Sequence, residues 1–170
     1  DGDINWIQSG DLYKTKFVNI TSKTITENGR RSSSALKIYK TPFLALAMYG
    51  ASVGNLSISK IDATVNQAVA VMDSEINDIR FYYYALEASK QELIASAQGG
   101  TQPNISQFLL KNWNLPTPPQ QEQTVIANFL DLETGKIGNL VEFAQKSLEI
   151  LKETRKSLIL ETVTKGLNKN

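Results

Sequence analysis

The sequence predicts an α+β protein: a mixed, β-rich globular domain followed by a long C-terminal helix that pairs as a coiled coil. Residues 1–71 contain short β-prone runs separated by turn residues. Residues 78–97 place apolar side chains at the helical period. Residues 136–164 repeat apolar side chains at alternating steps of four and three, which is the spacing of a coiled-coil seam.

The β-prone region divides into five runs. Alternation is clearest in FVNITSKTIT, where successive side chains face opposite sides of a strand. Turn signals separate the runs at ENGRRSSS, KTPF and YGASVGN. The predicted strands lie in NWIQ, KFVNITSKTI, LALAMYG, NLSISKI and ATVNQAVAVM.

The helix over 78–97 is ended by QGG, and its aromatic cluster FYYY is read as core in preference to a binding box. NISQF has the form of a short helix with Asn104 as its cap. WNLPTPP must be extended, because each proline disfavours helix in the residue before it. A helix then begins at QQEQ and is expected to end near Gly135.

The last predicted helix covers 136–164, would be roughly 43 Å long, and ends at Gly166. A stripe of this length needs a partner. Its seam consists of Ile137, Val141, Ala144, Leu148, Leu151, Arg155 and Leu158.

Composition excludes several classes of protein. A chain of 170 residues has room for one domain and an appendage, and 41% hydrophobic with 21% charged residues is typical of a globular protein. With no cysteine and no histidine, thiolate catalysis, disulfides and the commonest metal ligands are excluded. The absence of a long apolar run and of signal-peptide features at DGDINW favours a cytoplasmic protein. Since the first residue is not methionine, we expect a fragment or a processed chain.

Charge is unevenly distributed although the net charge is only +1. Residues 14–40 contain seven basic side chains against one acid, Glu27. Such a stretch attracts phosphate. The alternative is a solvated edge that keeps strands from aggregating.

No motif marks a catalytic or metal site. GASVGN lacks the lysine and hydroxyl of a phosphate-binding loop, so a turn between strands explains it better. The carboxylates lie mostly beside lysine or arginine on helix surfaces, as in LKETRK. We therefore expect no catalytic residue, no metal and no cofactor in this chain.

The proline step makes a resemblance visible. NLPTPPQQEQTVIANFLD followed by LEILKETRKSLILETVTKGL resembles the conserved region of the specificity subunits of type I restriction-modification systems. WIQSGDL, YGASVGNLSI, ATVNQAV and GGTQPNIS resemble phrases of that family's target recognition domain, in the same order.

The resemblance implies a subunit that reads one half of a split double-stranded DNA target. Such subunits carry two recognition domains held apart by two long helices that pair antiparallel. They bind modification (methyltransferase) and restriction subunits, on which S-adenosylmethionine, ATP and Mg²⁺ are expected. With one recognition domain and one long helix, this chain is either half of a longer subunit or a half-size subunit that forms a homodimer through the seam.

The implied organisation has three parts: a target recognition domain over 1–115 whose N-terminal strand is missing, the proline step and first conserved helix over 116–135, and the coiled-coil helix over 136–170. Gly135 and Gly138 interrupt a stretch that is commonly continuous in the family. Each glycine costs about 1 kcal/mol relative to alanine, so a bend or hinge is expected there.

DNA reading needs cations for phosphates and directional hydrogen-bonding groups for base edges. The phosphate candidates are Lys14, Lys16, Arg30 and Arg31, with Arg30 or Arg31 also able to bind guanine. The remaining candidates, from the family-like phrases and the divergent loop ENGRRSSSALK, are Ser9, Ser32, Tyr49, Ser52, Asn66, Gln67, Gln102 and Asn104. For Asn66, Gln67 and Asn104 the alternative is capping and turn bonding.

Two other function classes remain open at this point. The chain could be a coiled-coil protein-interaction module without DNA binding. An enzyme would require pocket carboxylates with shifted pKa values, and the missing histidine disfavours it.

Overall fold

The computed structural model describes residues 2–13, 15–34, 36–97 and 103–167. The chain divides into two units, residues 1–127 and 128–170, which are described separately. The α+β class with a long C-terminal helix is confirmed. No helix in the described ranges is both long and apolar enough to cross a membrane.

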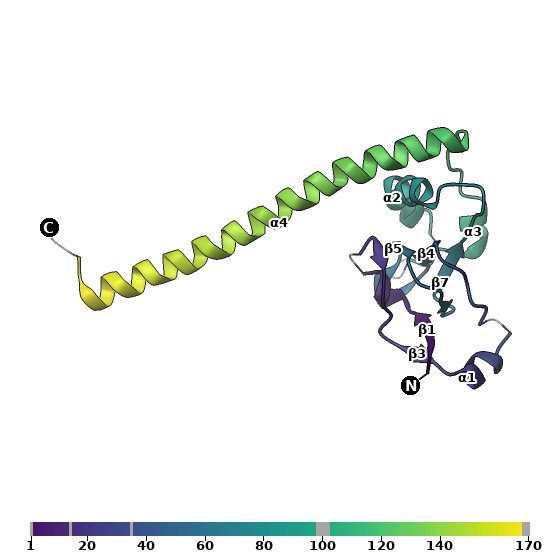
Figure 1. Cartoon of the computed structure of the whole chain (residues 1–170), viewed down its shortest axis with the longest axis horizontal. Helices are drawn as coiled ribbons and strands as arrows, with labels where there is room; N and C mark the ends of the chain where they lie inside the picture. Colours follow the sequence, from purple (N-terminus) through teal and green to yellow (C-terminus); the bar gives the residue numbers. More distant parts are fainter. Residues whose placement is uncertain (1, 14, 35, 98–102, 168–170) are drawn as a thin grey trace. The chain divides into compact units, whose positions relative to one another are not determined.

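The first unit is built on two small sheets (Figure 1). One has the order β2-β5-β4-β7, with β4 antiparallel to β5 and β7, and β2 parallel to β5. The other has the order β3-β1-β6, with β3 antiparallel and β6 parallel to β1. The strands are β1 (Ile4–Ile7), β2 (Phe17–Val18), β3 (Thr24–Ile25), β4 (Phe43–Ala47), β5 (Leu56–Ser59), β6 (Thr64–Val65) and β7 (Val69–Met72).

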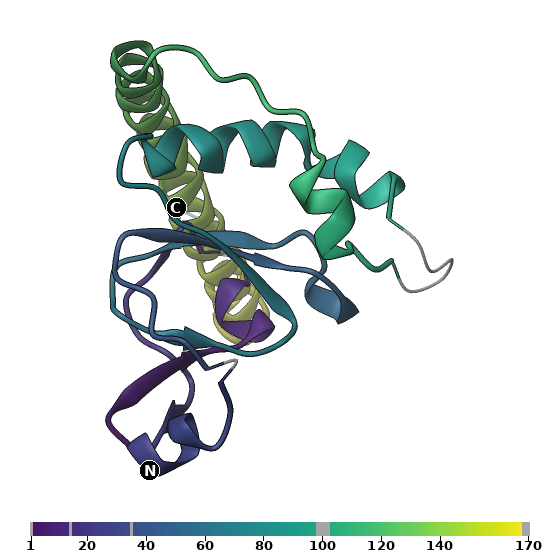
Figure 2. The ribbon, with the colours of Figure 1, turned by 90° about the vertical axis from the view of Figure 1, so that its right-hand side faces the viewer.

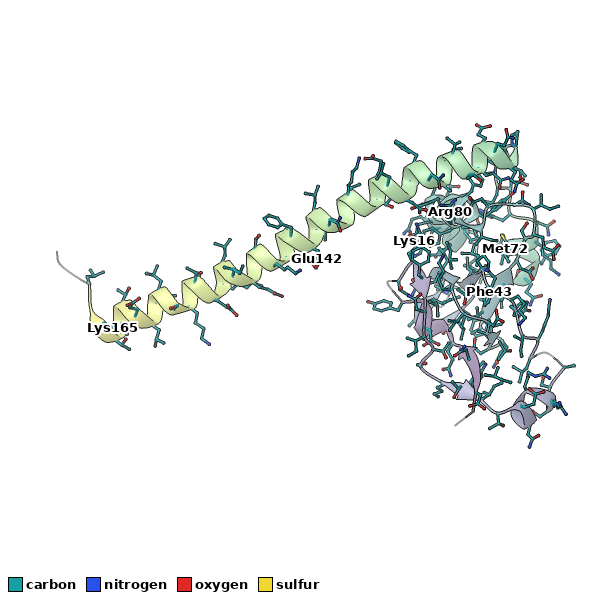
Figure 3. All side chains as sticks on the ribbon, viewed as in Figure 1. Lys16, Phe43, Met72, Arg80, Glu142 and Lys165 are labelled. Atoms are coloured by element: carbon teal, nitrogen blue, oxygen red, sulfur yellow. The ribbon has the colours of Figure 1, made fainter. Side chains whose placement is uncertain are left out.

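Strand β4 is the centre of the core, because all five of its residues are buried. Side chains of a strand alternate between faces. Leu44 and Leu46 accordingly join one apolar cluster with Leu86 of helix α2, while Phe43, labelled in Figure 3, and Ala45 join a second cluster on the other face. A strand covered on both faces reads as the continuous apolar run FLALA.

Helix α2 (Ile79–Ala95) covers one face of the four-stranded sheet (Figure 2). It begins after Asp78, whose carboxylate accepts a hydrogen bond from the Arg80 backbone N–H at 3.0 Å. Leu86 and Leu93 are buried in the cluster beneath it. The helix predicted over 78–97 is confirmed.

Several local predictions need correction. The region from 16 to 25 contains the two short strands β2 and β3 in place of one alternating strand. ENGRRSSS does not form a turn: it contains helix α1 (Glu27–Arg31), capped by the Thr26 hydroxyl. Helix α3 (Gln107–Lys111) is capped by Ser106, not by Asn104. Two 3-10 helices, η1 (Ser9–Leu12) and η2 (Gly50–Ser52), follow β1 and β4.

The proline step leads into helix α4 (Gln120–Lys165) through one buried glutamine. Gln123 is only 1% exposed. Its Oε1 accepts from the Asp78 backbone N–H at 3.0 Å, and its Nε2 donates to Asn77 Oδ1 at 3.0 Å and to the Pro118 carbonyl at 2.9 Å. Both amide N–H groups donate and the amide oxygen accepts one hydrogen bond, so this glutamine joins the start of α4 to the start of α2.

Helix α4 runs without interruption from Gln120 to Lys165. The expected helix end near Gly135 is therefore wrong. The ion pair between Glu133 and Lys136, 2.7 Å, supports helix at that point. Gly166 ends the helix as predicted, in a left-handed conformation with φ of +75°.

Within residues 128–167 no side chain is buried. The five large apolar members of the predicted seam are between 51% and 65% exposed: Ile137, Val141, Leu148, Leu151 and Leu158. A second group of exposed apolar side chains, Phe129, Leu140, Phe143 and Ile150, follows another line along α4. Both lines are available for association.

Gly54 is required by its conformation and by its neighbour. Its φ is +76°, and a Cβ built there would lie 2.6 Å from Ile94 Cδ1 of α2. Gly50 shares the left-handed conformation, with φ of +81°, but has open space around it. We expect Gly54→Ala to lower the free energy of unfolding by about 2 kcal/mol and Gly50→Ala by about 1 kcal/mol. Urea unfolding of both variants checks this, and equal losses would contradict a role for the contact with Ile94.

Candidate nucleic-acid interface

Six of the predicted DNA-contacting residues meet at one end of the sheets. They are called the polar loop cluster: Ser9, Tyr49, Ser52, Asn66, Gln67 and Asn104. Ser9 and Asn66 follow the parallel strands β1 and β6, so both leave the sheet at the same edge. β4 ends beside the start of β7, where Ala47 pairs with Val69, and this places Tyr49 next to Gln67.

Backbone contacts hold this cluster together. Asn104 forms an isolated bridge with Tyr49, and the Ile105 N–H donates to the Met48 carbonyl at 2.8 Å. Asn66 also has a structural task, because its Oδ1 accepts from the Ala68 N–H at 3.1 Å. Gln67 and Asn104 are exposed. The cluster therefore presents amide and hydroxyl groups on a fixed frame, while base contact by any member stays a prediction.

Helix α1 is exposed to solvent and carries Arg30 and Arg31, which the sequence predicts to contact DNA. Both side chains bind Glu27: Arg30 through two nitrogens, at 2.9 Å and 2.6 Å, and Arg31 through Nε at 2.8 Å. Ser32 follows them and donates its hydroxyl to the Gly29 carbonyl at 2.6 Å. No residue of α1 is buried.

The contacts within α1 keep Glu27 ionised. Hydrogen bonds from Arg30 and then Arg31 lower the pKa of Glu27 to about 2, and Glu27 in turn raises the pKa of Arg30. Glu27 and Arg30 are therefore both charged near neutral pH. A net positive charge remains on α1.

Lys16 lies in an aromatic setting, although the sequence placed it among the loop cations. Its Nζ donates to the Tyr84 hydroxyl at 2.7 Å and lies 4.4 Å from the centre of that ring. It also lies 5.2 Å from the centre of the Phe17 ring. Lys16 thus links β2 to α2, and a phosphate contact from it stays a prediction. Lys14 and Gln102 lie outside the described residues.

The polar loop cluster and α1 are not brought together. β3 pairs with the beginning of β1, since Ile25 lies opposite Ile4, and α1 follows β3. The polar loop cluster follows the other end of β1. The four residues of β1 span about 13 Å, so the two groups stand at opposite ends of that strand. Figure 1 shows α1 at the end of the molecule where β3 lies.

Two features were missed from the sequence. Glu27 was counted only as the single acid of the basic stretch, although its spacing of three and four residues from Arg30 and Arg31 is that of helical ion pairs. Lys60 lies 4.7 Å from the centre of the Phe17 ring. No local pattern marks that contact, because it joins residues on β2 to residues after β5.

One cavity of the first unit lies against the four-stranded sheet. A cavity of about 420 Å³ between the β4/β7 sheet and helices α2 and α3 is lined largely by apolar side chains such as Leu46, Leu86 and Leu110. Its charged lining residues are Asp73 and Lys111. In the part of the chain that the structure describes, no group of three acidic, histidine or cysteine side chains could hold a metal ion.

Residues 1–139 match the family model described as the type I restriction modification DNA specificity domain. The chain belongs to this family. The resemblance seen in the sequence is confirmed.

Two relatives illustrate the similarity to other specificity subunits. The type I restriction enzyme MjaVIII specificity subunit of Methanocaldococcus jannaschii is 25% identical over 158 residues, which cover 92% of this chain and 33% of the relative. The EcoBI specificity subunit of Escherichia coli is 30% identical over 110 residues, covering 63% of this chain and 23% of the relative. The chain thus spans about a third of the length of the first of these proteins.

Solved structures share the fold of this specificity domain. A chain from a structure on complex assembly and conformational transition of the type I R-M system has a TM-score of 0.79, with 16% identity over 98% of this chain and 40% of that chain. The HsdS subunit from Thermoanaerobacter tengcongensis has a TM-score of 0.67, with 15% identity over 98% of this chain and 38% of its own.

Proposed function

We propose that this chain is a DNA-recognition subunit, or part of one, of a type I restriction-modification enzyme, and that it reads one half of a split target without catalysing a reaction. The observation that carries the proposal is that a specificity domain presents two separate groups: a fixed cluster of amide and hydroxyl side chains, and an exposed helix carrying two arginines. Directional hydrogen-bonding groups read base edges, and positive charges bind phosphates.

The two groups have different tasks. Arg31, whose side chain is 72% exposed, is placed to bind phosphate, which fixes position without reading sequence. The polar loop cluster provides donors and acceptors for base edges, with Gln67 and Asn104 its exposed amides. A DNA duplex that contacts both groups at once would hold the domain in one register.

Helix α4 supplies the association surfaces. The seam from Ile137 to Leu158 pairs with the long helix of a second recognition half or of a second copy, and fixes the distance between half-sites. The second line, which includes Phe129, Leu140 and Phe143, is a further exposed apolar surface of α4, and the modification subunits are partners of the same assembly. Those subunits and the restriction subunit carry S-adenosylmethionine, ATP and Mg²⁺, and the assembly works in the cytoplasm.

A salt titration of DNA binding tests the proposal. The logarithm of the association constant for a mixed-sequence duplex should fall linearly with the logarithm of salt concentration. Arg31→Ala should reduce the magnitude of this slope by about 0.9, the value for one lost phosphate contact. Lys90→Ala, which removes the same charge from α2, should leave the slope unchanged; Lys90 pairs with Glu87 at 3.7 Å.

The same titration separates the alternative function. A protein-interaction module with a coiled-coil helix would bind no DNA, even with modification subunits present. Binding that is insensitive to salt would contradict a reader anchored on phosphates.

A further inference from the structure

Glu27 holds Arg30 in a single orientation. Oε2 of Glu27 accepts from Arg30 Nε at 2.9 Å, and Oε1 accepts from Arg30 Nη2 at 2.6 Å. Two parallel hydrogen bonds between a carboxylate and a guanidinium fix the plane of the guanidinium as well as its position. A single contact fixes only the distance.

Arg31 is bound to the same carboxylate in a weaker way. It reaches Oε1 through Nε alone, at 2.8 Å, and its side chain is 72% exposed. The Arg30 side chain is 29% exposed. Of the two arginines, Arg30 is therefore the one whose orientation is set before any ligand arrives.

The helix beneath the pair is itself fixed at both ends. The Thr26 hydroxyl accepts from the Gly29 N–H at 3.1 Å, and the Arg30 N–H donates to the Thr26 carbonyl at 2.9 Å. At the other end the Ser32 hydroxyl donates to the Gly29 carbonyl at 2.6 Å. Since no residue of α1 is buried, this hydrogen-bonded turn is accessible to a duplex.

The contacts with Glu27 leave Arg30 with N–H groups that can bind a second acceptor. A guanidinium has five N–H groups, and the two hydrogen bonds to Glu27 use the edge formed by Nε and Nη2. The edge formed by Nη1 and Nη2 carries two parallel N–H groups. That edge matches O6 and N7 of guanine, the commonest specific contact of arginine in the major groove.

We propose that Glu27 is a positioning residue for sequence recognition, which orients Arg30 to read a guanine in the major groove. This inference rests on the proposed function and adds a named reader and its support. Glu27 also reduces the positive charge of α1, which weakens attachment to phosphates at other sequences. The Glu27 carboxylate thus favours binding to the target sequence and disfavours binding to other sequences.

Selection from a library of random DNA duplexes tests the proposal. The chain is used as it is produced from its own locus, with the subunits that copurify. Arg30→Ala should relax the preference for one guanine by about fivefold or more, the lower end of a bidentate contact. Glu27→Gln, which keeps Arg30, should relax the same position and also bind random-sequence duplex more tightly than the wild-type chain does.

Two controls separate positioning from charge and from folding. Glu92→Gln removes the same charge from an exposed site on α2 and should relax no position. The double variant Glu27→Gln with Arg30→Ala should have the same base preferences as Arg30→Ala alone, because Glu27 acts through Arg30. A role confined to stabilising α1 would instead add a further loss.

Three outcomes would overturn the inference. In the first, Glu27→Gln retains the guanine preference that Arg30→Ala loses. In the second, Arg30→Ala relaxes no guanine. In the third, Glu27→Gln relaxes a different position from Arg30→Ala. A wild-type chain that selects no sequence at all is a distinct result, since it contradicts the proposed function itself.

Discussion

Replacing Gln123 with leucine is expected to lower the free energy of unfolding of the first unit by about 3 kcal/mol. Leucine has a similar size but cannot replace the three hydrogen bonds to Asp78, Asn77 and Pro118. Each buried polar group left without a partner costs about 1–3 kcal/mol. Urea unfolding followed by tryptophan fluorescence measures the loss.

Gln121→Leu is the matched control for this experiment. It makes the same substitution on the same turn of α4, at an exposed position. We expect a change within about 0.5 kcal/mol, as for surface substitutions in general. Equal losses in the two variants would show that the glutamine network contributes nothing specific.

Replacing Leu148 with glutamate is expected to raise the dissociation constant for pairing through α4 by at least about 100-fold. Pairing buries the seam, and an ionised carboxylate buried there without a partner would cost several kcal/mol. In the single chain Leu148 is 53% exposed, so the helix itself tolerates the substitution. Analytical ultracentrifugation over a range of concentrations measures the change.

Asn139→Glu is the control for the seam variant. Asn139 is exposed and lies on the side of α4 away from Ile137 and Val141 by helical geometry. The Asn139→Glu substitution adds the same negative charge as Leu148→Glu and should leave the dissociation constant for pairing unchanged. If Leu148→Glu associates as strongly as Asn139→Glu, the seam is not the pairing surface.

The helices with strong periodic patterns were predicted correctly from the sequence, and several short elements were not. The FVNITSKTIT alternation predicted one strand, but Ile20 is 82% exposed there. The Ser22 N–H donates to Asp11 and the Thr21 hydroxyl to the Lys23 carbonyl. Local bonds of this kind replace those of a strand ladder, and a pattern of apolar residues does not reveal them.

Helix α1 shows the opposite error. Glycine, asparagine and serine in ENGRRSSS are turn signals, but a cap at Thr26 and ion pairs from Glu27 stabilise five helical residues. Five residues are too few for a period to be recognised. Gly135 and Gly138 similarly predicted a break in the C-terminal helix. The low helix propensity of two glycines is outweighed by the helical sequence on both sides of them.

The members of the polar loop cluster were predicted one by one as DNA contacts, which stay predictions, and their grouping was not predicted. Tyr49 and Asn104 are 55 positions apart in the sequence and meet through an isolated bridge. Such non-local pairing follows from the order of the strands, which no local pattern in this sequence specifies. For the same reason, Lys16 was assigned to a loop surface when its ammonium group packs against Tyr84.

The exposure of α4 beyond Ala127 has a consequence for how the protein reaches its folded form. Most helical stability in proteins comes from packing of an apolar face. Residues 128–167 have no buried side chain, and they include Gly135 and Gly138. Folding of this segment should therefore be coupled to association, so that its helicity rises with protein concentration by mass action. Amide hydrogens near the two glycines should then exchange fastest in dilute solution and become protected once the seam is covered.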